Sequence, residues 1–481
     1  MHKIASIPGD GIGPEVVSAT IQVVKKLASK LGFQVEFTHI PWGTNYYKEH
    51  GKFMSDDALD ILRKFDAGLF GAVGDPDVPD HVSLWGLLLK IRSPLQLYAN
   101  VRPVRTFPGT KSPLRTAKNG IDWVLVRENS EGEYCGQGGR SHIGHPWEAA
   151  TEVAVFTRVA IERIMRFAFE TARSRPRKKL TVVTKSNAMR HGMVLWDEVA
   201  AEVARDFPDV DWDKMLVDAI TIRMVAEPDS LDTIVGTNLH MDILSDLAAG
   251  LAGSIGVAPS SNLDPIRQNP SLFEPVHGSA FDIAGKGVAN PVATFWSAAE
   301  MLSWLGEKEA ADKLMDCVER VCRAGILTAD LGGKAKTQDV VDARPKSRYL
   351  NTRGGVRLAS SDPFAPPLAG PARGNKLRAS LTETPSLAAF NSVELVPGDN
   401  ITSDEDLEAY IRGAADSLFH PSGTCAVGKL ELGGVVDAGF RVHGVMGVRV
   451  VDANVLPMLP ATHIQSSVYA IADMAADAIL S

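Results

Sequence analysis

The stretch KIASIPGDGIGPEVVSATIQVVKKLASKLGFQVEFTHI, residues 3–40, decides the fold class of this chain. A short apolar run at 4–7 is followed by an amphipathic stretch at 15–31 and a second apolar run at 35–40. Because a strand, a helix and a second strand produce this alternation, the stretch predicts an α/β fold with its active site at strand ends. The pattern continues to about residue 340, with further strands expected at 67–70, 123–126, 180–184 and 233–237 and helices at 158–173, 194–206 and 298–305.

The glycine-rich turn in this stretch, Gly9-Asp-Gly-Ile-Gly13, resembles a dinucleotide-binding fingerprint only superficially. The spacing GxGxxG is absent, and Pro14 stands where a helix would begin. We therefore do not interpret the turn as a Rossmann motif.

Length and charge limit the classes of function. The 481 residues suit two or three domains, and a net charge of -8 gives no electrostatic basis for nucleic-acid binding. Neither a signal peptide nor a stretch long enough to span a membrane is expected. The four cysteines, Cys135, Cys317, Cys322 and Cys425, form no CxxC pair, which fits reduced thiols and a cytoplasmic location.

A change in composition after Ala343 predicts a domain boundary. Residues 344–374 are rich in Gly, Pro, Ser and Arg, which is typical of a linker. We expect one domain at 1–343, a linker-like stretch at 344–374 and a separate C-terminal segment at 375–481.

Two carboxylates, Asp242 and Asp246, are four residues apart and share one face of a predicted helix. Like charges at this spacing repel each other, and the continuation Leu247-Ala-Ala-Gly-Leu-Ala-Gly is apolar enough to be buried. A cation such as Mg²⁺ or Mn²⁺ would offset both effects, with Asp218 as a third oxygen ligand. A solvated helix face remains the alternative for the aspartates alone.

A group of basic residues suits an anionic substrate. Arg92, Arg102 and Arg127 carry guanidinium groups that bind carboxylates through two parallel hydrogen bonds. Tyr134 could donate a proton, and Lys185 could act as a base if burial and a nearby metal ion lowered its pKa. Taken singly, each arginine is more often a surface salt-bridge partner, so the spacing is only suggestive.

The loop at 273–290, FEPVHGSAFDIAGKGVAN, contains glycines that allow a ligand to approach the backbone closely. Nucleotide binding is one role that such a loop could have.

These motifs resemble one family, the isocitrate, isopropylmalate and tartrate/D-malate dehydrogenases, over residues 3–342. The opening strand and loop at 7–15, the Val126-Arg-Glu-Asn-Ser-Glu-Gly motif and the Asp242-Ile-Leu-Ser-Asp246 helix carry the resemblance. Residues 77–88, 174–178 and 184–187 are most similar to the tartrate/D-malate branch. In that branch, Trp85 would fill the space that isopropylmalate enzymes leave for an alkyl group. The implied fold is two α/β subdomains around a central cleft.

The resemblance implies a role for each matching residue. Arg92, Arg102 and Arg127 would bind the carboxylates of a small 2-hydroxy dicarboxylic acid. Tyr134 would be the acid and Lys185 the base, and Asp218, Asp242 and Asp246 would bind Mg²⁺ or Mn²⁺, which would polarise the C2 oxygen and stabilise the enolate left by decarboxylation. Since Lys185 and Asp218 reach the neighbouring subunit's site in this family, a homodimer with shared active sites is implied.

The same resemblance implies that the 273–290 loop binds NAD. A carboxylate at Asp282 would accept hydrogen bonds from ribose hydroxyls and repel the 2′-phosphate of NADP. Two departures, Phe281 for a common proline and His240-Met241 for a common Phe-Gly, leave the catalytic groups in place. The residues expected at the cofactor are His277, Gly278, Ser279, Ala280, Asp282, Ile283 and Asn290.

The C-terminal segment resembles a different family, the glucose-methanol-choline (GMC) flavin oxidoreductases. The motifs at 419–428, 434–437, 440–445 and 450–457 and the run from Pro460 resemble the end of these enzymes. His420 and His463 match their two active-site histidines, but the flavin-binding half is missing, so we expect a partial α+β fragment that binds no FAD. We expect a strand at 448–451 and one apolar helix face at Val468, Ile471, Ala472, Ala475 and Ile479.

Three functional hypotheses follow from the two resemblances. The first, which we favour, is a hydroxy-acid dehydrogenase with every expected catalytic residue in its own motif. The second is an FAD-dependent alcohol oxidase fragment, and the third is a catalytically impaired fusion protein.

Overall fold

The computed structural model describes residues 1–343, 425–445, 447–456 and 465–480. The chain divides into two compact units, Met1–Pro345 and Lys346–Ser481. The linker-like stretch expected at 344–374 and the two histidines His420 and His463 lie outside the described residues.

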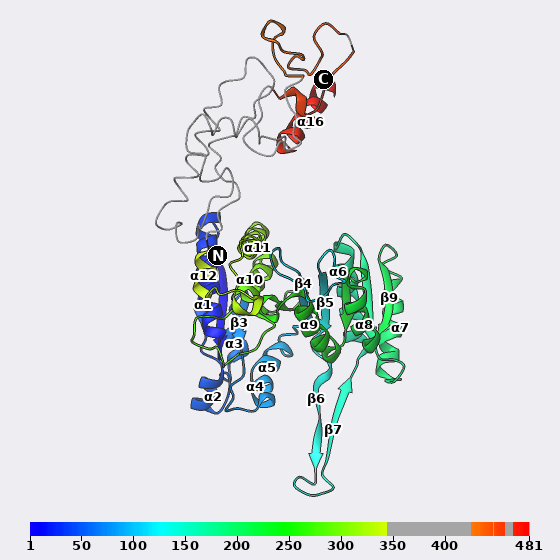
Figure 1. Cartoon of the computed structure of the whole chain (residues 1–481). Helices are drawn as coiled ribbons and strands as arrows, with labels where there is room; N and C mark the ends of the chain where they lie inside the picture. The colour runs from blue at the N-terminus through cyan, green and yellow to red at the C-terminus, as the bar shows by residue number, and fades with distance from the viewer. Residues whose placement is uncertain (344–424, 446, 457–464, 481) are drawn as a thin grey trace, which may run out of the picture. The chain divides into compact units, whose positions relative to one another are not determined.

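The first unit is built on one ten-stranded sheet, which confirms the predicted α/β fold (Figure 1). Most neighbouring strands are parallel, but β11 is antiparallel to both of its neighbours, and β4 is antiparallel to β5. In order across the sheet the strands are β2 (Val35–His39), β1 (His2–Gly9), β3 (Ala67–Ala72), β12 (Ser271–Pro275), β11 (Pro259–Leu263), β4 (Ala99–Arg105), β5 (Asp122–Glu128), β10 (Thr233–Gly236), β8 (Lys179–Thr184) and β9 (Asp211–Leu216).

All of the six strands named from the apolar pattern are present. Four others were not predicted: β4, β9, β11 and β12. Each carries polar residues or proline, as in Ala-Asn-Val-Arg-Pro-Val-Arg of β4 and Asp-Trp-Asp-Lys-Met-Leu of β9. Tertiary burial therefore decides their conformation more than local propensity does.

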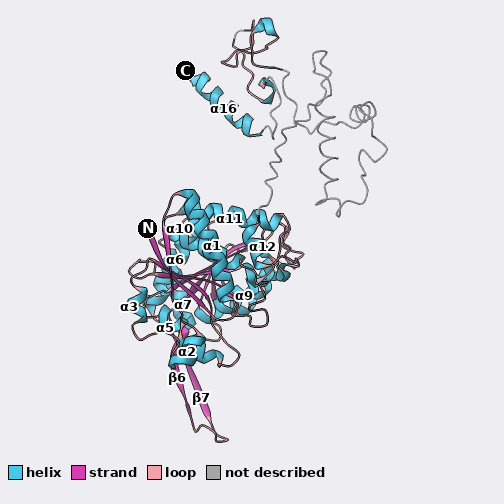
Figure 2. Cartoon of the chain, turned by 90° about the vertical axis from the view of Figure 1, so that its left-hand side faces the viewer, coloured by secondary structure: helices cyan, strands magenta, loops and turns pink. Residues whose placement is uncertain are grey.

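Helices cover both faces of the sheet and form two groups, one around each half (Figures 1 and 2). The half that contains β1 carries α1 (Gly13–Leu31), α10 (Val292–Trp304), α11 (Lys308–Arg323) and α12 (Thr337–Asp342), with the short α2 (Thr44–His50), α3 (Ala58–Leu62), α4 (Asp80–Gly86) and α5 (Leu88–Arg92). The half that contains β9 carries α6 (Arg158–Ser174), α7 (Gly192–Ala204), α8 (Val217–Ala226) and α9 (Asn238–Ala252). The predicted helices at 158–173, 194–206 and 298–305 correspond to α6, α7 and the second half of α10.

Helix α6 shows how local sequence produces these elements. The Thr157 hydroxyl accepts a hydrogen bond from the backbone N–H of Ala160, which caps the first turn. Its buried residues recur three or four positions apart, so one apolar stripe faces the sheet. That stripe consists of Ala160, Ile161, Ile164, Met165, Ala168, Phe169 and Ala172.

A two-stranded arm, β6 (Gly132–Ser141) and β7 (Ala149–Val155), projects from the first unit (Figures 1 and 2). Most of its residues are exposed, and its sequence lacks an apolar alternation because β6 is rich in glycine and polar residues. The sequence therefore did not predict the arm.

The β1–α1 turn is glycine-rich because backbone approaches it closely. Gly9 has φ +67° and pairs with Ala72 of β3, and a Cβ at Gly9 would lie 1.9 Å from the Ala72 carbonyl oxygen. A Cβ at Gly11 would lie 1.9 Å from the carbonyl oxygen of Ser279. Neighbouring protein backbone thus accounts for both glycines.

In the second unit, the described residues form turns, isolated β-bridges, two short 3-10 helices at Leu430–Leu432 and Ala453–Val455, and one α-helix, α16 (Gln465–Leu480). Ile471 and Ala475 of this helix are buried in an apolar cluster with Val436, Phe440 and Val455. The helix prediction is confirmed, although Ala472 is exposed and the side chain of Ile479 is outside the described set. The predicted strand at 448–451 is wrong, since only Arg449 forms a bridge there, to Arg441.

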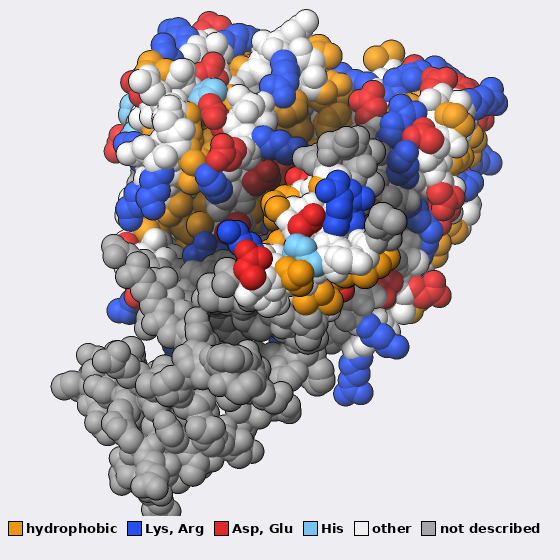
Figure 3. Space-filling view, turned by 90° about the horizontal axis from the view of Figure 1, so that it is seen from above, with side chains coloured by type: hydrophobic (Ala, Val, Ile, Leu, Met, Phe, Trp, Pro, Cys, Tyr) orange, Lys and Arg blue, Asp and Glu red, His pale blue; other side chains and the backbone are white. Residues whose placement is uncertain are grey.

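Charged side chains of both signs are interspersed on the face that Figure 3 shows, which agrees with the modest net charge. Among the described residues, no helix combines the length and apolar character that crossing a membrane requires.

We predict that Gly9→Ala destabilises the protein far more than Gly32→Ala does. Both glycines have positive φ, but nothing lies within 4 Å of a Cβ at Gly32, the residue after α1. Gly32→Ala should therefore lower the free energy of unfolding by about 1 kcal/mol, and Gly9→Ala by about 3 kcal/mol or more because backbone must also move. Urea unfolding followed by circular dichroism measures both, and equal losses would contradict this explanation of the turn.

Candidate active site

Two arginines lie on one face of the central antiparallel strands β4 and β5. Arg127 of β5 pairs in register with Asn100 of β4, and Arg102 is two residues after Asn100 on β4. Both arginine side chains therefore project to the same side of the sheet. Both arginines are buried, with 7% of Arg102 and 3% of Arg127 exposed. Asn100 Oδ1 accepts a hydrogen bond of 3.0 Å from Arg102 Nε.

Helix α9 brings Asp242 and Asp246 against this pair of arginines. Thr237 caps the helix by accepting a hydrogen bond from His240 N–H, and the two aspartates follow one turn apart. Arg127 forms an ion pair with Asp242, while Arg102 lies 3.8 Å from Asp242 Oδ1 and 3.8 Å from Asp246 Oδ1. The group therefore contains two buried cations and two partly exposed carboxylates.

The pKa values of the two carboxylates are shifted in opposite directions. Burial alone would raise the pKa of Asp242, but the charges of Arg127 and Arg102 and hydrogen bonds from Arg127 and Tyr134 lower it overall. Burial raises the pKa of Asp246, and the charge of Asp242 adds to that effect. Burial and the nearby Arg127 lower the pKa of Arg102 to about 10, which leaves it charged at neutral pH.

Tyr134 completes this group from the base of the arm. Its hydroxyl donates a hydrogen bond of 3.2 Å to Asp242 Oδ2, and its ring lies under the guanidinium of Arg127 at 5.3 Å. Burial and the charge of Asp242 raise the pKa of Tyr134, so the phenol keeps its proton at neutral and mildly alkaline pH.

Arg92, at the end of α5, is held by a carboxylate that the sequence analysis did not identify. It forms a buried ion pair with Glu274 of β12, and Glu274 also accepts a hydrogen bond of 2.8 Å from Asn262. The side chains are 7% and 6% exposed. A fixed counterion therefore orients Arg92 in the folded chain.

Lys185 and Asp218 form a second group. Lys185 Nζ lies 2.9 Å from Asp218 Oδ1, and hydrogen bonding to this lysine is the main cause that lowers the pKa of Asp218. Within the described residues, no three His, Cys, Asp or Glu side chains come together as a metal site would require. One chain therefore does not bring Asp218 to the Asp242–Asp246 pair.

The loop from His277 to Asn290 lies against the start of α1. Ser279 O accepts a hydrogen bond of 2.8 Å from Ile12 N, and Ala280 and Ile283 pack against Ile12. Asn290 donates to Asp330 Oδ2 at 2.9 Å. Gly278 and the side chain of Asp282 are exposed on this loop.

His277 carries a polar atom that the described chain does not satisfy. Its Nδ1 lies 3.0 Å from the carbonyl oxygen of Gly278, while its buried Nε2 has no partner among the described residues. Burial lowers the pKa of His277, so the ring is neutral at pH 7.

Four supporting residues were missed by the sequence analysis. Asn238 accepts hydrogen bonds from Arg127, and Ser245 accepts one from Arg102. Glu274 holds Arg92, and Asp330 holds Asn290. Glu274 is the second residue of the quoted stretch 273–290 and lies within β12, so it could have been found as an acidic residue in an apolar strand, whereas Asp330 lies in no motif.

Comparison with known proteins covers both parts of the chain. A family model described as isocitrate/isopropylmalate dehydrogenase matches residues 3–343. A second model, described as GMC oxidoreductase, matches residues 351–472. Both resemblances noted in the sequence are thereby confirmed.

Individual relatives match the first unit over nearly their whole length. A probable tartrate dehydrogenase/decarboxylase from Agrobacterium vitis is 64% identical over 344 residues, which are 71% of this chain and 96% of the relative. The decarboxylating D-malate dehydrogenase of Escherichia coli is 48% identical over 71% of this chain and 97% of its own. The crystal structure of isocitrate dehydrogenase from Methylococcus capsulatus, 38% identical, covers 71% of this chain and 98% of that one with a TM-score of 0.65.

We predict that Glu274→Gln lowers the free energy of unfolding by about 3 kcal/mol, because it leaves the charge of Arg92 buried without a counterion. The matched control is Glu309→Gln, which breaks the exposed Glu309–Lys313 pair of α11 and should change stability by less than about 0.5 kcal/mol. Urea unfolding of both variants without substrate tests this. A loss at Glu274 no larger than the loss at Glu309 would show that the buried pair is not needed.

Proposed function

The chain belongs to the isocitrate/isopropylmalate dehydrogenase family through residues 3–343, and from this membership we propose that it oxidises a small 2-hydroxy dicarboxylic acid with NAD and Mg²⁺ or Mn²⁺. Tartrate and D-malate are the proposed substrates, because both are named in the activities of its relatives. The oxidised acid is also proposed to lose CO₂, as the name decarboxylase of these relatives suggests. The observation that carries the proposal is the single group formed by Arg102, Arg127, Tyr134, Asp242 and Asp246.

The arginines support a dianionic substrate. Three buried arginines come from three elements, Arg92 from α5, Arg102 from β4 and Arg127 from β5. Burial removes water from their guanidinium groups, so a bound anion would stabilise these charges. Trp85 of α4 supports a short acid: its ring would lie 2.8 Å from a Cβ at Gly136 of the arm, so little room remains there for an alkyl group.

The carboxylates fit a divalent cation. Asp242 and Asp246 offer oxygen ligands one turn apart, and Mg²⁺ and Mn²⁺ prefer such oxygens. Burial and the charge of Asp242 raise the pKa of Asp246, and a bound cation would stabilise its ionised form, which also fits a metal site. Asp218 of a second subunit is proposed as the third ligand.

The 277–290 loop fits NAD. The unsatisfied Nε2 of His277 offers a hydrogen bond to a ligand, and the exposed carboxylate of Asp282 suits ribose hydroxyls better than a 2′-phosphate. We therefore propose His277, Gly278, Ser279, Ala280, Asp282, Ile283 and Asn290 as the cofactor-binding residues and NAD as the preferred cofactor.

The chain's own residues would handle the protons. Lys185 takes the proton of the substrate hydroxyl, and Tyr134, which keeps its proton through its raised pKa, returns one to the enolate carbon after CO₂ leaves. Arg92, Arg102 and Arg127 hold the carboxylates so that these groups face the reacting carbons. A bound divalent ion supplies Lewis-acid polarisation of the C2 oxygen, and NAD supplies the hydride acceptor.

A homodimer with shared sites accounts for the separation of the two groups. Ile222 and Val225 follow Asp218 on α8, and Leu239 and Ile243 flank Asp242 on α9, and all four are exposed apolar side chains. Helices α8 and α9 pack against each other, so these side chains lie on adjoining elements. An exposed apolar face of this kind is typical of a subunit interface.

For the C-terminal unit we propose no flavin chemistry and do not expect FAD, although its match to a GMC oxidoreductase model makes flavin absorbance of the purified protein the direct check. The four cysteines form no disulfide. Thiols of this kind persist in a reducing compartment, so we propose that the enzyme works in the cytoplasm.

We predict that oxidation of tartrate or D-malate requires a divalent metal and that Asp246→Asn lowers kcat/KM at least about 100-fold. The matched control is Asp312→Asn, an exposed aspartate of α11. NADH formation in the presence of Mn²⁺, and after EDTA, measures activity, and electron paramagnetic resonance of Mn²⁺ measures metal binding without turnover. Full activity in excess EDTA, or an Asp246→Asn variant that still binds Mn²⁺ normally, would overturn the metal assignment.

We also predict that two inactive variants complement each other when mixed as subunits. In a shared site, Lys185→Met and Tyr134→Phe chains form a heterodimer in which one site has both wild-type residues. Random reassociation should then restore about a quarter of wild-type activity, since about half of the dimers are mixed and each has one working site.

The control mixes Tyr134→Phe with Asp246→Asn, whose residues lie in one group on the same chain. If Tyr134 and Asp246 of one chain serve the same site, each site of that heterodimer lacks one of the two residues. Activity should therefore stay as low as in the two parent variants. Failure of the Lys185–Tyr134 mixture to regain activity, with mixed dimers verified by mass spectrometry, would exclude the shared site.

A further inference from the structure

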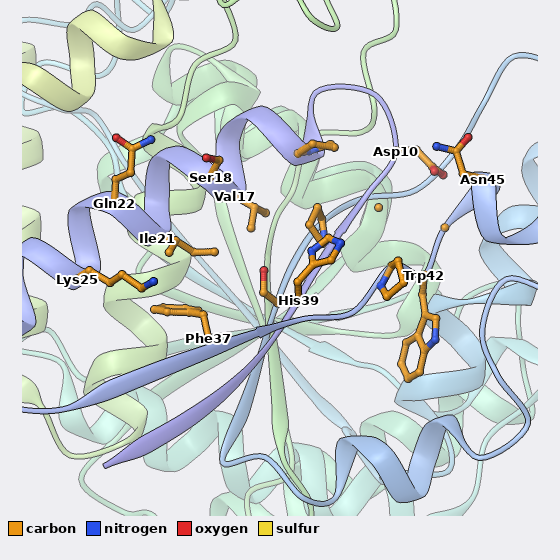
Figure 4. Close-up of a pocket in the computed structure, with 16 residues that line it drawn as sticks. Asp10, Val17, Ser18, Ile21, Gln22, Lys25, Phe37, His39, Trp42 and Asn45 are labelled. Atoms are coloured by element: carbon orange, nitrogen blue, oxygen red, sulfur yellow. The ribbon is translucent and has the colours of Figure 1, made fainter.

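A groove of about 590 Å³ lies between α1 and the edge strand β2 (Figure 4). Small-molecule sites usually enclose about 300–1,000 Å³, so the groove is large enough for one. In Figure 4, Lys25, Ile21 and Phe37 stand at one end, and Asp10, Trp42 and Asn45 at the other. Neither the proposed reaction nor the family comparison uses this groove.

The lining offers flat apolar surfaces. Rings contribute a large share of the walls, and the aliphatic side chains of Val17 and Ile21 add to them. The planar rings are those of Phe37, His39 and Trp42, and the saturated rings of Pro8, Pro14 and Pro41 add apolar surface. The planar faces favour a flat apolar partner, because stacking brings many atoms into contact at once.

The rim favours a negative charge at the α1 end. Lys25 is exposed on α1 and forms no ion pair with any residue in the described part of the chain. Gln22, three residues before it on the same helix, lines the same wall of the groove. Asp10 is the acidic residue of the lining, but its oxygens accept hydrogen bonds from Thr44 N and Oγ1 at 2.7 Å and from Gly74 N at 3.0 Å. These three donors occupy the carboxylate of Asp10 within the protein, whereas the ammonium of Lys25 is available to a ligand.

The groove is distinct from the proposed cofactor loop. Helix α1 separates the two, since Ile12 and Val16 pack against Ala280 and Ile283, whereas Val17 and Ile21 line the groove. A ligand in the groove would therefore occupy a different space from one on the 277–290 loop.

We propose that this groove binds a planar aromatic carboxylate, with its ring system between the side chains of α1 and β2 and its carboxylate on Lys25. The volume, the ring-rich walls and the unpaired ammonium together define this class of ligand.

The test uses the full-length protein and 2-naphthoate as the probe, with binding measured by isothermal titration calorimetry. The uncharged match, 2-naphthalenemethanol, separates the carboxylate contribution from the apolar one. Lys25→Gln should weaken naphthoate binding about tenfold, because a charge-assisted hydrogen bond is lost. Lys30→Gln, on the last turn of the same helix but outside the groove, is the matched control.

A second variant, Ile21→Trp, fills the groove and should abolish binding while circular dichroism verifies the fold. Saturating NAD should leave naphthoate binding unchanged. The proposal is overturned if wild-type protein does not bind naphthoate, if Lys25→Gln and Lys30→Gln bind it equally, or if NAD displaces it. These outcomes do not depend on the enzyme's substrate, so they are distinguishable from a failure of the proposed function.

Discussion

The contact between the buried arginines of the central strands and the carboxylates of α9 is the constraint on which this structure depends. Arg127 joins Asp242, and Arg102 lies 3.8 Å from both Asp242 and Asp246. Cations buried at this depth are tolerated only when carboxylates and hydrogen-bond acceptors surround them, so β4, β5 and α9 must keep their relative positions. The geometry that folding requires is also the geometry that an anionic substrate and a metal ion would use.

A second set of constraints keeps the sheet and the loops in place around this group. Gly9 and Gly11 let β1 and its turn touch the backbone of β3 and of the 277–290 loop, and Asp10 joins this turn to Thr44 and Gly74 through three hydrogen bonds. Glu274 reaches Arg92 from β12. Each of these contacts joins segments far apart in the chain. The central strands connect the half of the sheet that would hold the cofactor to the half that carries α9.

The separation of Asp218 from the Asp242–Asp246 pair gives the proposed dimer a physical role. A metal ligand that one chain keeps away from that pair would serve a site only across an interface, and Asp218 is also the ion-pair partner of Lys185. The exposed apolar residues of α8 and α9 border both groups. The C-terminal unit contributes no residue to this arrangement in the proposal. Its helix α16 instead buries Ile471 and Ala475 against nearby valines and Phe440.

The sequence by itself determined the α/β class, the strands with continuous apolar runs and the identity of the charged residues that meet at the candidate site, because local periodicity and residue chemistry carry that information. It could not identify β4 or the β6–β7 arm, whose polar and glycine-rich sequences become strands only through pairing. Nor could it show that Glu274 holds Arg92, since the two are 182 residues apart. Only the tertiary structure decided which charges are paired, because pairing depends on distances across the sheet that spacing along the chain does not encode.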